Sequence, residues 1–172
     1  MAYDSLHALA AAVLDACRAK KLRLATAESC TGGMVATALT DIAGSSAVVE
    51  RGFVTYSNQA KHELLGVPLE LIDAQGAVSA EVAEAMVVGA LTCAPVELAV
   101  AITGIAGPGG GSPTKPVGLV WFGIAATGTA PRVESHVLPG DRAAVRLAST
   151  RRALELLLAA AKASKDNDAS QR

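Results

Sequence analysis

The chain has 172 residues, which is enough for one well-buried domain and too few for two domains of ordinary size. Apolar residues make up 51% of it but aromatic residues only 3%, so the core has to be built from Ala, Val, Leu and Ile, which suits a helix-covered sheet better than an antiparallel sandwich. The formal net charge of -1 gives no electrostatic reason to expect nucleic acid or an anionic membrane as a partner.

Helical and strand patterns alternate along the chain. In chain order they predict a helix over 5–20, a strand over 22–26, helices over 31–39, 59–65, 68–73, 79–92 and 141–162, and strands over 48–56, 98–103, 117–127 and 132–138. Only a short turn at Gly128 separates the last two strands, which favours a hairpin and therefore a mixed sheet. We expect an α/β fold, a three-layer α/β/α sandwich with a mixed β-sheet, as a single domain over 1–163 with a polar tail over 164–172.

The first stretch with chemical potential is T-A-E-S-C-T-G-G at 26–33, where a predicted strand gives way to a helix. Such a turn exposes its residues next to the unpaired N–H groups of the helix. A protein can hold a nucleophile there, beside an oxyanion or a phosphate, and this stretch offers two hydroxyls and a thiol, those of Ser29, Thr31 and Cys30. The alternative is that Ser29 or Thr31 only caps the helix while the glycines allow close packing.

A second stretch, Y-S-N-Q-A-K at 56–61, places a lysine in the first turn of a helix. If Asn58 is the N-cap, Lys61 is the third helical residue, where the helix dipole disfavours an ammonium group. A lysine that is held and shielded there has a lowered pKa and can act as a neutral base. The alternative is an ordinary solvated lysine.

Two further stretches point to an anion or a bound ligand. Residues 104–111, G-I-A-G-P-G-G-G, follow a strand but have neither the ending of a P-loop nor a helix after them, so no nucleotide-binding motif is indicated. They predict a loop whose N–H groups face a ligand, or a simple surface connection. Arg142 follows the helix cap Asp141, where a bound phosphate would explain an arginine; the alternative is a solvated side chain.

The cysteines and histidines give no sign of a metal or a disulfide framework. The three cysteines share no short spacing, and the three histidines form no i, i+3 or i, i+4 pair. We expect no metal and no cofactor. The sequence shows no signal peptide and no apolar run of about 18 residues, so we predict a cytoplasmic protein without a membrane span. The scarcity of charge and the richness in Ala and Val suit a homo-oligomer.

Six motifs occur in order along the chain: T-A-E-S-C-T-G-G, Y-S-N-x-x-K, G-A-V-S at 76–79, T-G-I-A-G-P-G-G-G at 103–111, K-P-V-G at 115–118 and G-D-R at 140–142. Together they resemble the C-terminal domain of the CinA (competence/damage-inducible) family over roughly 6–158, and more closely its stand-alone nicotinamide mononucleotide deamidases. The resemblance implies a small-molecule nucleotide substrate, nicotinamide mononucleotide, hydrolysed to nicotinic acid mononucleotide and ammonia. A catalytically silent nucleotide-binding or assembly module of the same family stays open as a second class of function.

The resemblance also implies roles for individual residues. It makes Ser29 the nucleophile and Lys61 its base, in agreement with their predicted positions. Tyr56 is expected to assist by orienting Lys61 or the carboxamide. The remaining residues expected at the substrate are Glu28, Thr31, Gly32, Gly33, Asn58, Thr103, Gly104, Gly107 and Arg142. The N–H groups over 31–33 are the candidate oxyanion donors, and Arg142 is the candidate phosphate contact. Cys30 is an alternative nucleophile, disfavoured because no histidine partner is evident.

Overall fold

The computed structural model describes residues 2 to 164, so the predicted tail from 165 onward lies outside the described residues. The helices are α1 (Ala2–Ala19), α2 (Met34–Thr40), α3 (Asn58–Leu65), α4 (Leu69–Gln75), α5 (Ala80–Cys93) and α6 (Arg142–Ala163), with a 3-10 turn η1 (Ser45–Ala47). The strands are β1 (Leu24–Glu28), β2 (Val49–Val54), β3 (Leu98–Gly104), β4 (Leu119–Ala126) and β5 (Arg132–Val137).

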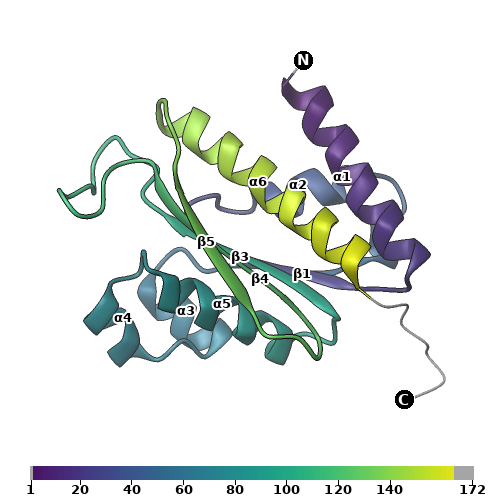
Figure 1. Ribbon diagram of the computed structural model, residues 1–172, viewed down its shortest axis with the longest axis horizontal. Helices are drawn as coiled ribbons and strands as arrows, with labels where there is room; N and C mark the ends of the chain where they lie inside the picture. The colour runs from purple at the N-terminus through teal and green to yellow at the C-terminus, as the bar shows by residue number, and fades with distance from the viewer. Residues whose placement is uncertain (1, 165–172) are drawn as a thin grey trace.

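One five-stranded sheet, in the order β2-β1-β3-β4-β5, forms the middle layer. Strand β1 pairs in parallel with β2 and β3, whereas the β3–β4 and β4–β5 pairs are antiparallel. Helices α1, α2 and α6 lie over one face of the sheet, and α3, α4 and α5 lie over the other (Figure 1). The predicted three-layer α/β/α sandwich with a mixed sheet is confirmed.

The two faces of the sheet are packed differently because β3 alternates large and small side chains. Its leucine, valine and isoleucine enter the core beneath α1 and α6, and its alanines enter the core beneath α5. A Cβ added to Gly123 of β4 would lie 2.6 Å from the carbonyl oxygen of Ala83 in α5. On the far side of α5, a Cβ on Gly89 would lie 2.0 Å from the carbonyl oxygen of Leu65 at the end of α3. Small residues therefore hold α3, which carries Lys61, close to α5 and the sheet.

The carboxyl ends of β1 and β3 lie side by side where their connections leave in opposite directions. From β1 the chain runs through α2 to β2, and from β3 it crosses a long loop to β4 on the other side. Glu28 pairs with Ile102, and the Ser29 N–H donates to the Ile102 carbonyl at 2.9 Å. Open α/β sheets bind ligands at such a switch point.

The helix predicted over 31–39 begins later, at Met34. Gly32 and Gly33 before it have left-handed φ angles of 60° and 97°, so residues 29–33 form a separate turn. Glycine reaches these angles without a steric penalty, and a right-handed helix cannot run through them. The nucleophile candidate therefore lies in a tight turn rather than in the first turn of a helix.

Candidate active site

Ser29, in the turn after β1, and Lys61, on α3, meet inside the protein. The Lys61 Nζ lies 3.0 Å from the Ser29 Oγ and donates to the carbonyl oxygen of Thr55 at 2.8 Å. Only 1% of Lys61 and 8% of Ser29 is exposed. An amine in direct hydrogen-bond contact with a hydroxyl can take up the proton of that hydroxyl as it attacks a carbon atom.

Burial sets the protonation of Lys61. It lowers the pKa of the ammonium from 10.5 to about 8, because a charged group loses its hydration inside the protein. The N-cap of α3 is Ser57 rather than the predicted Asn58: its side chain accepts from the Ala60 N–H at 3.0 Å, which makes Lys61 the fourth helical residue. The low pKa of Lys61 thus follows from its enclosure more than from the helix dipole.

Cys30 stands next to Ser29 but is poorly suited to be the nucleophile. Burial raises the pKa of its thiol to about 11, although the nearby Lys61 acts in the opposite direction. The thiolate is the reactive form of cysteine, so a thiol with this pKa is almost entirely unreactive near neutral pH. The electrostatics favour Ser29 over Cys30.

Glu28 anchors the start of α2. Its buried carboxylate accepts from the N–H groups of Gly33 at 3.0 Å, Val35 at 3.1 Å and Ala36 at 2.9 Å. The Gly32 N–H in turn donates to the carbonyl of Ser29 at 3.0 Å. Contrary to the sequence prediction, the N–H groups of Gly32 and Gly33 are therefore not available oxyanion donors. Glu28 has a capping contact, and its predicted contact with the substrate stays a prediction.

Arg142, the first residue of α6, joins two loops. Its Nη1 donates to the carbonyl of Gly107 at 2.9 Å, and its Nη2 donates to the Tyr56 hydroxyl at 2.8 Å. Three residues singled out in the sequence therefore come together at one place. Arg142 is exposed to solvent, as the alternative expected, but its guanidinium is also held by these two contacts. The Tyr56 hydroxyl contacts Arg142, whereas the Lys61 amine contacts other groups.

A cleft of about 500 Å³ opens beside Arg142. Its lining residues are Ala106, Pro108, Val117, Gly140, Asp141, Arg142, Ala143 and Arg146. Arg142 makes this the part of the site suited to an anion such as a phosphate. Arg142 and Arg146 also connect the cleft to the Ser29 turn and to Tyr56, so the cleft and the Ser29–Lys61 pair belong to one region.

The other predicted site residues have different surroundings. Thr103 is buried and donates its hydroxyl to the Ala77 carbonyl at 2.7 Å. A Cβ on Gly104 would lie 2.7 Å from Val120 Cγ2, so this glycine permits close packing. Thr31 is fully buried, and its hydroxyl has no partner within residues 2–164. Asn58 is exposed at the start of α3.

Two contacts at the site escape sequence reasoning. Nothing in the sequence indicates that the Thr55 carbonyl binds Lys61, because every residue carries a carbonyl group. Arg146 donates from Nε to the Cys30 carbonyl at 3.1 Å and from Nη2 to the Thr31 carbonyl at 2.9 Å. Its spacing of four residues from Arg142, which puts both on one face of α6, was the available signal.

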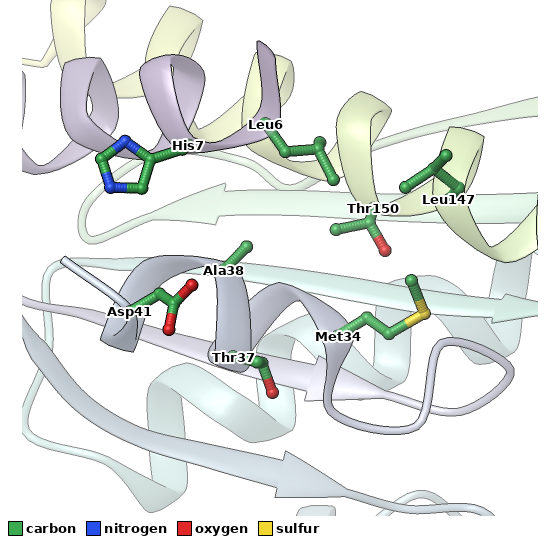
Figure 2. A pocket seen from close by; sticks show the side chains of 8 residues that line it. All are labelled: Leu6, His7, Met34, Thr37, Ala38, Asp41, Leu147 and Thr150. Carbon is green, nitrogen blue, oxygen red and sulfur yellow. The ribbon is translucent and has the colours of Figure 1, made fainter. Parts of the chain in front are cut away.

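A second, smaller pocket of about 170 Å³ lies between α1, α2 and α6. Figure 2 shows Leu6 of α1 and Thr150 of α6 across from Ala38 of α2. Its lining is mainly apolar and contains no arginine or lysine to bind a phosphate, so the active site is assigned to the cleft at Arg142 instead. Nowhere in the described part of the chain do three or more His, Cys, Asp or Glu side chains cluster as a metal would require.

Comparisons with known proteins agree on one family. The model of the CinA C-terminal domain matches residues 6–161. The chain is 51% identical over 147 residues to a nicotinamide-nucleotide amidohydrolase PncC of Enterobacter agglomerans, covering 86% of this chain and 90% of that protein. It is 58% identical over 134 residues to a CinA-like protein of Mycolicibacterium vanbaalenii, covering 78% of this chain but only 32% of that protein. The crystal structure of the competence/damage inducible protein CihA from Agrobacterium tumefaciens superposes with a TM-score of 0.87 at 48% identity, covering 90% and 94% of the two chains.

The contacts of Glu28 predict the effect of neutralising it. In Glu28→Gln the amide NH₂ group would face a backbone N–H donor, and the charge that favours the start of α2 would be lost. We expect the free energy of unfolding in urea to fall by about 2 kcal/mol. Glu81→Gln, an exposed change in the first turn of α5, should alter it by less than about 0.5 kcal/mol. Equal stabilities of the two variants would contradict the anchoring role.

Proposed function

The chain belongs to the CinA C-terminal domain family, and we propose that it is an amidohydrolase that converts nicotinamide mononucleotide to nicotinic acid mononucleotide and ammonia. The observation that carries the proposal is the buried 3.0 Å contact between the Lys61 amine and the Ser29 hydroxyl. The substrate class is supported by relatives whose names state nicotinamide-nucleotide amidohydrolase, among them the proteins of Enterobacter agglomerans and Escherichia coli. The reaction would serve the salvage of pyridine nucleotides.

In the first half of the proposed reaction Ser29 is acylated. The Ser29 oxygen attacks the carboxamide carbon while its proton passes to the neutral Lys61 amine 3.0 Å away. The carbon–nitrogen bond of the resulting tetrahedral intermediate then breaks. The Lys61 ammonium returns the proton to the departing nitrogen, which leaves as ammonia, and the nicotinoyl group remains as an ester of Ser29.

In the second half water removes the acyl group. Lys61 is neutral again and takes a proton from a water molecule, whose oxygen attacks the ester carbon. The bond to the Ser29 oxygen breaks, the Lys61 proton returns to that oxygen, and the acid product leaves. Lys61 begins and ends each half-reaction as a neutral amine, so the pKa of about 8 lets the same group take and return the proton.

The proposed position of the substrate follows from the charges around the pair. The nucleotide phosphate is placed in the cleft at Arg142, whose guanidinium has N–H groups beyond the two that bind Gly107 and Tyr56. The carboxamide then lies toward the Ser29 turn. Tyr56 follows β2, is exposed, and its hydroxyl accepts from Arg142; we propose that it orients the carboxamide.

We also propose that the protein is located in the cytoplasm and forms a homo-oligomer. No helix within residues 2–164 has the length and hydrophobicity needed to cross a bilayer. The primary test of the function is release of ammonia when the purified protein is mixed with nicotinamide mononucleotide. Binding of the nucleotide without any ammonia would favour the silent binding module instead.

The identity of the nucleophile is tested by two neighbouring substitutions. Ser29→Ala removes the attacking oxygen and should lower kcat by about 10³-fold or more. Cys30→Ala should keep kcat within about tenfold, because a thiol with a raised pKa contributes little to attack. Ammonia release from nicotinamide mononucleotide measures both. An inactive Cys30→Ala beside an active Ser29→Ala would reverse the assignment.

The role of Lys61 as a base predicts a pH dependence. At pH values below its pKa of about 8, Lys61 is an ammonium and cannot accept a proton. We therefore expect kcat/KM to rise with pH through a single ionisation near 8. Lys61→Arg should be inactive at every pH tested up to about 10, because a guanidinium keeps its proton there. Lys162→Arg, an exposed change near the end of α6, is the matched control and should follow the wild-type profile. Near-normal turnover of Lys61→Arg would show that Ser29 uses another base.

The proposed phosphate contact predicts a difference between two substrates. Arg142→Ala also breaks the contacts with Gly107 and Tyr56, so some loss of activity should affect both nicotinamide mononucleotide and the phosphate-free riboside. Loss of a charged hydrogen bond, about 1.5–3 kcal/mol, should raise KM for the nucleotide by a further factor of about 10 to 150. The ratio of the two KM changes is the measurement. A ratio near one would show that Arg142 does not bind the phosphate.

A further inference from the structure

We propose that Arg146 is a positioning residue, which orients the turn after Ser29 so that the Thr31 N–H is directed at the oxyanion of the tetrahedral intermediate. The proposal rests on the amidohydrolase function argued above. Nothing in that mechanism so far stabilises the negative oxygen, since the N–H groups of Gly32 and Gly33 already have acceptors. Oxyanion stabilisation is commonly among the largest contributions to catalysis of acyl transfer.

The grip of Arg146 on the turn is specific. From the second turn of α6 its Nε donates to the Cys30 carbonyl at 3.1 Å and its Nη2 to the Thr31 carbonyl at 2.9 Å. Two adjacent carbonyls are thus held by two atoms of one rigid, planar group. Gly32 lies beside this contact, since a Cβ there would be in van der Waals contact with the Arg146 Nη2 at 3.4 Å; its φ of 60° is what favours glycine.

Because each peptide group is planar, fixing the carbonyls of Cys30 and Thr31 also fixes the directions of the N–H groups that follow them. In a planar trans peptide the N–H points away from the carbonyl of the preceding residue. The Gly32 N–H accordingly points away from the held Thr31 carbonyl, and it donates to the Ser29 carbonyl at 3.0 Å. By the same rule the Thr31 N–H points away from the held Cys30 carbonyl, and therefore away from Arg146.

Thr31 has two hydrogen-bond donors, its backbone N–H and its hydroxyl, that are not used within the described residues. Within residues 2–164 its backbone N–H meets no acceptor, and its hydroxyl, on a fully buried residue, also lacks a partner. Buried donors without acceptors are rare in native proteins because each costs free energy. A donor two residues after the nucleophile that is fixed but unused is what a transient negative oxygen requires.

The first test separates positioning from substrate binding. Arg146→Lys keeps the charge but cannot hold two carbonyls with one planar group, and kcat for nicotinamide mononucleotide should fall by about 10²-fold. KM should stay within about threefold, and the ionisation near pH 8 in kcat/KM should not move, because Lys61 is untouched. A large rise in KM with kcat retained would show that Arg146 binds substrate instead, which would overturn the proposal.

A second measurement keeps a general loss of structure distinct from a loss of orientation. In Arg146→Ala, guanidinium ion at low millimolar concentration should restore kcat by about tenfold or more, since the ion can refill the vacated site. Arg152→Lys is the matched control on the same helix, where Arg152 binds Glu134 and Glu155 away from Ser29. It should change stability but not kcat. Equal kcat losses in Arg146→Lys and Arg152→Lys, or no rescue by guanidinium, would overturn the proposal.

A substrate-independent measurement separates this proposal from the function it rests on. If the wild type releases no ammonia from nicotinamide mononucleotide, the proposed substrate is wrong, and phosphonylation of Ser29 by a fluorophosphonate, followed by mass spectrometry, decides on Arg146. The phosphoryl oxygen of the reagent gains negative charge as the serine attacks and needs the same donor. Arg146→Lys should react at least about tenfold more slowly. Equal rates in the two proteins, or no labelling of the wild type, would overturn the positioning role.

Discussion

The burial of one amine constrains the rest of this site. An ammonium in the interior loses its hydration, and Lys61 is compensated by hydrogen bonds with the Ser29 hydroxyl and the Thr55 carbonyl. The result is a lysine whose pKa lies near 8 and whose partner is a serine. Reaching that arrangement requires α3 to lie close to α5 and the sheet, which the glycine at position 89 permits.

Two charged side chains hold the turn that contains Ser29, one by binding backbone N–H groups and the other by binding backbone carbonyls. The Glu28 carboxylate collects N–H groups at the start of α2, and the Arg146 guanidinium collects the carbonyls of Cys30 and Thr31. With both ends of the turn satisfied, little reorganisation is needed when charge develops on the substrate, which is how preorganised sites lower a barrier. The two glycines supply the backbone angles that this turn requires.

The sequence predicted the parts of the site that depend on local position. Ser29 was recognisable because a strand ends there, and Arg142 because it follows a helix cap. Lys61 was predicted near a helix start, but its N-cap was displaced by one residue, because Ser57 and Asn58 are both good caps and the sequence alone does not choose between them. The order of strands and helices was enough to predict the layers.

The contacts that depend on how distant elements are rotated against each other were not predictable. Glu28 carries a side chain suited to a substrate, yet the left-handed turn after it folds the start of α2 onto its carboxylate. Arg146 reaches the turn only because α6 packs across the sheet with that face toward it. Spacing places Arg146 on the same face of α6 as Arg142, but it does not show that this face meets the turn after Ser29.

A direct titration of Lys61 tests the central claim, that burial lowers the pKa of its amine to about 8. Nuclear magnetic resonance of protein labelled with ¹³C and ¹⁵N on lysine can follow the Cε and Nζ shifts of this side chain, assigned by their loss in Lys61→Arg. We expect a midpoint near 8 for Lys61, well below the unperturbed lysine value of about 10.4. A Lys61 midpoint at or above about 10.4 would contradict a neutral base and, with it, the proposed serine–lysine chemistry.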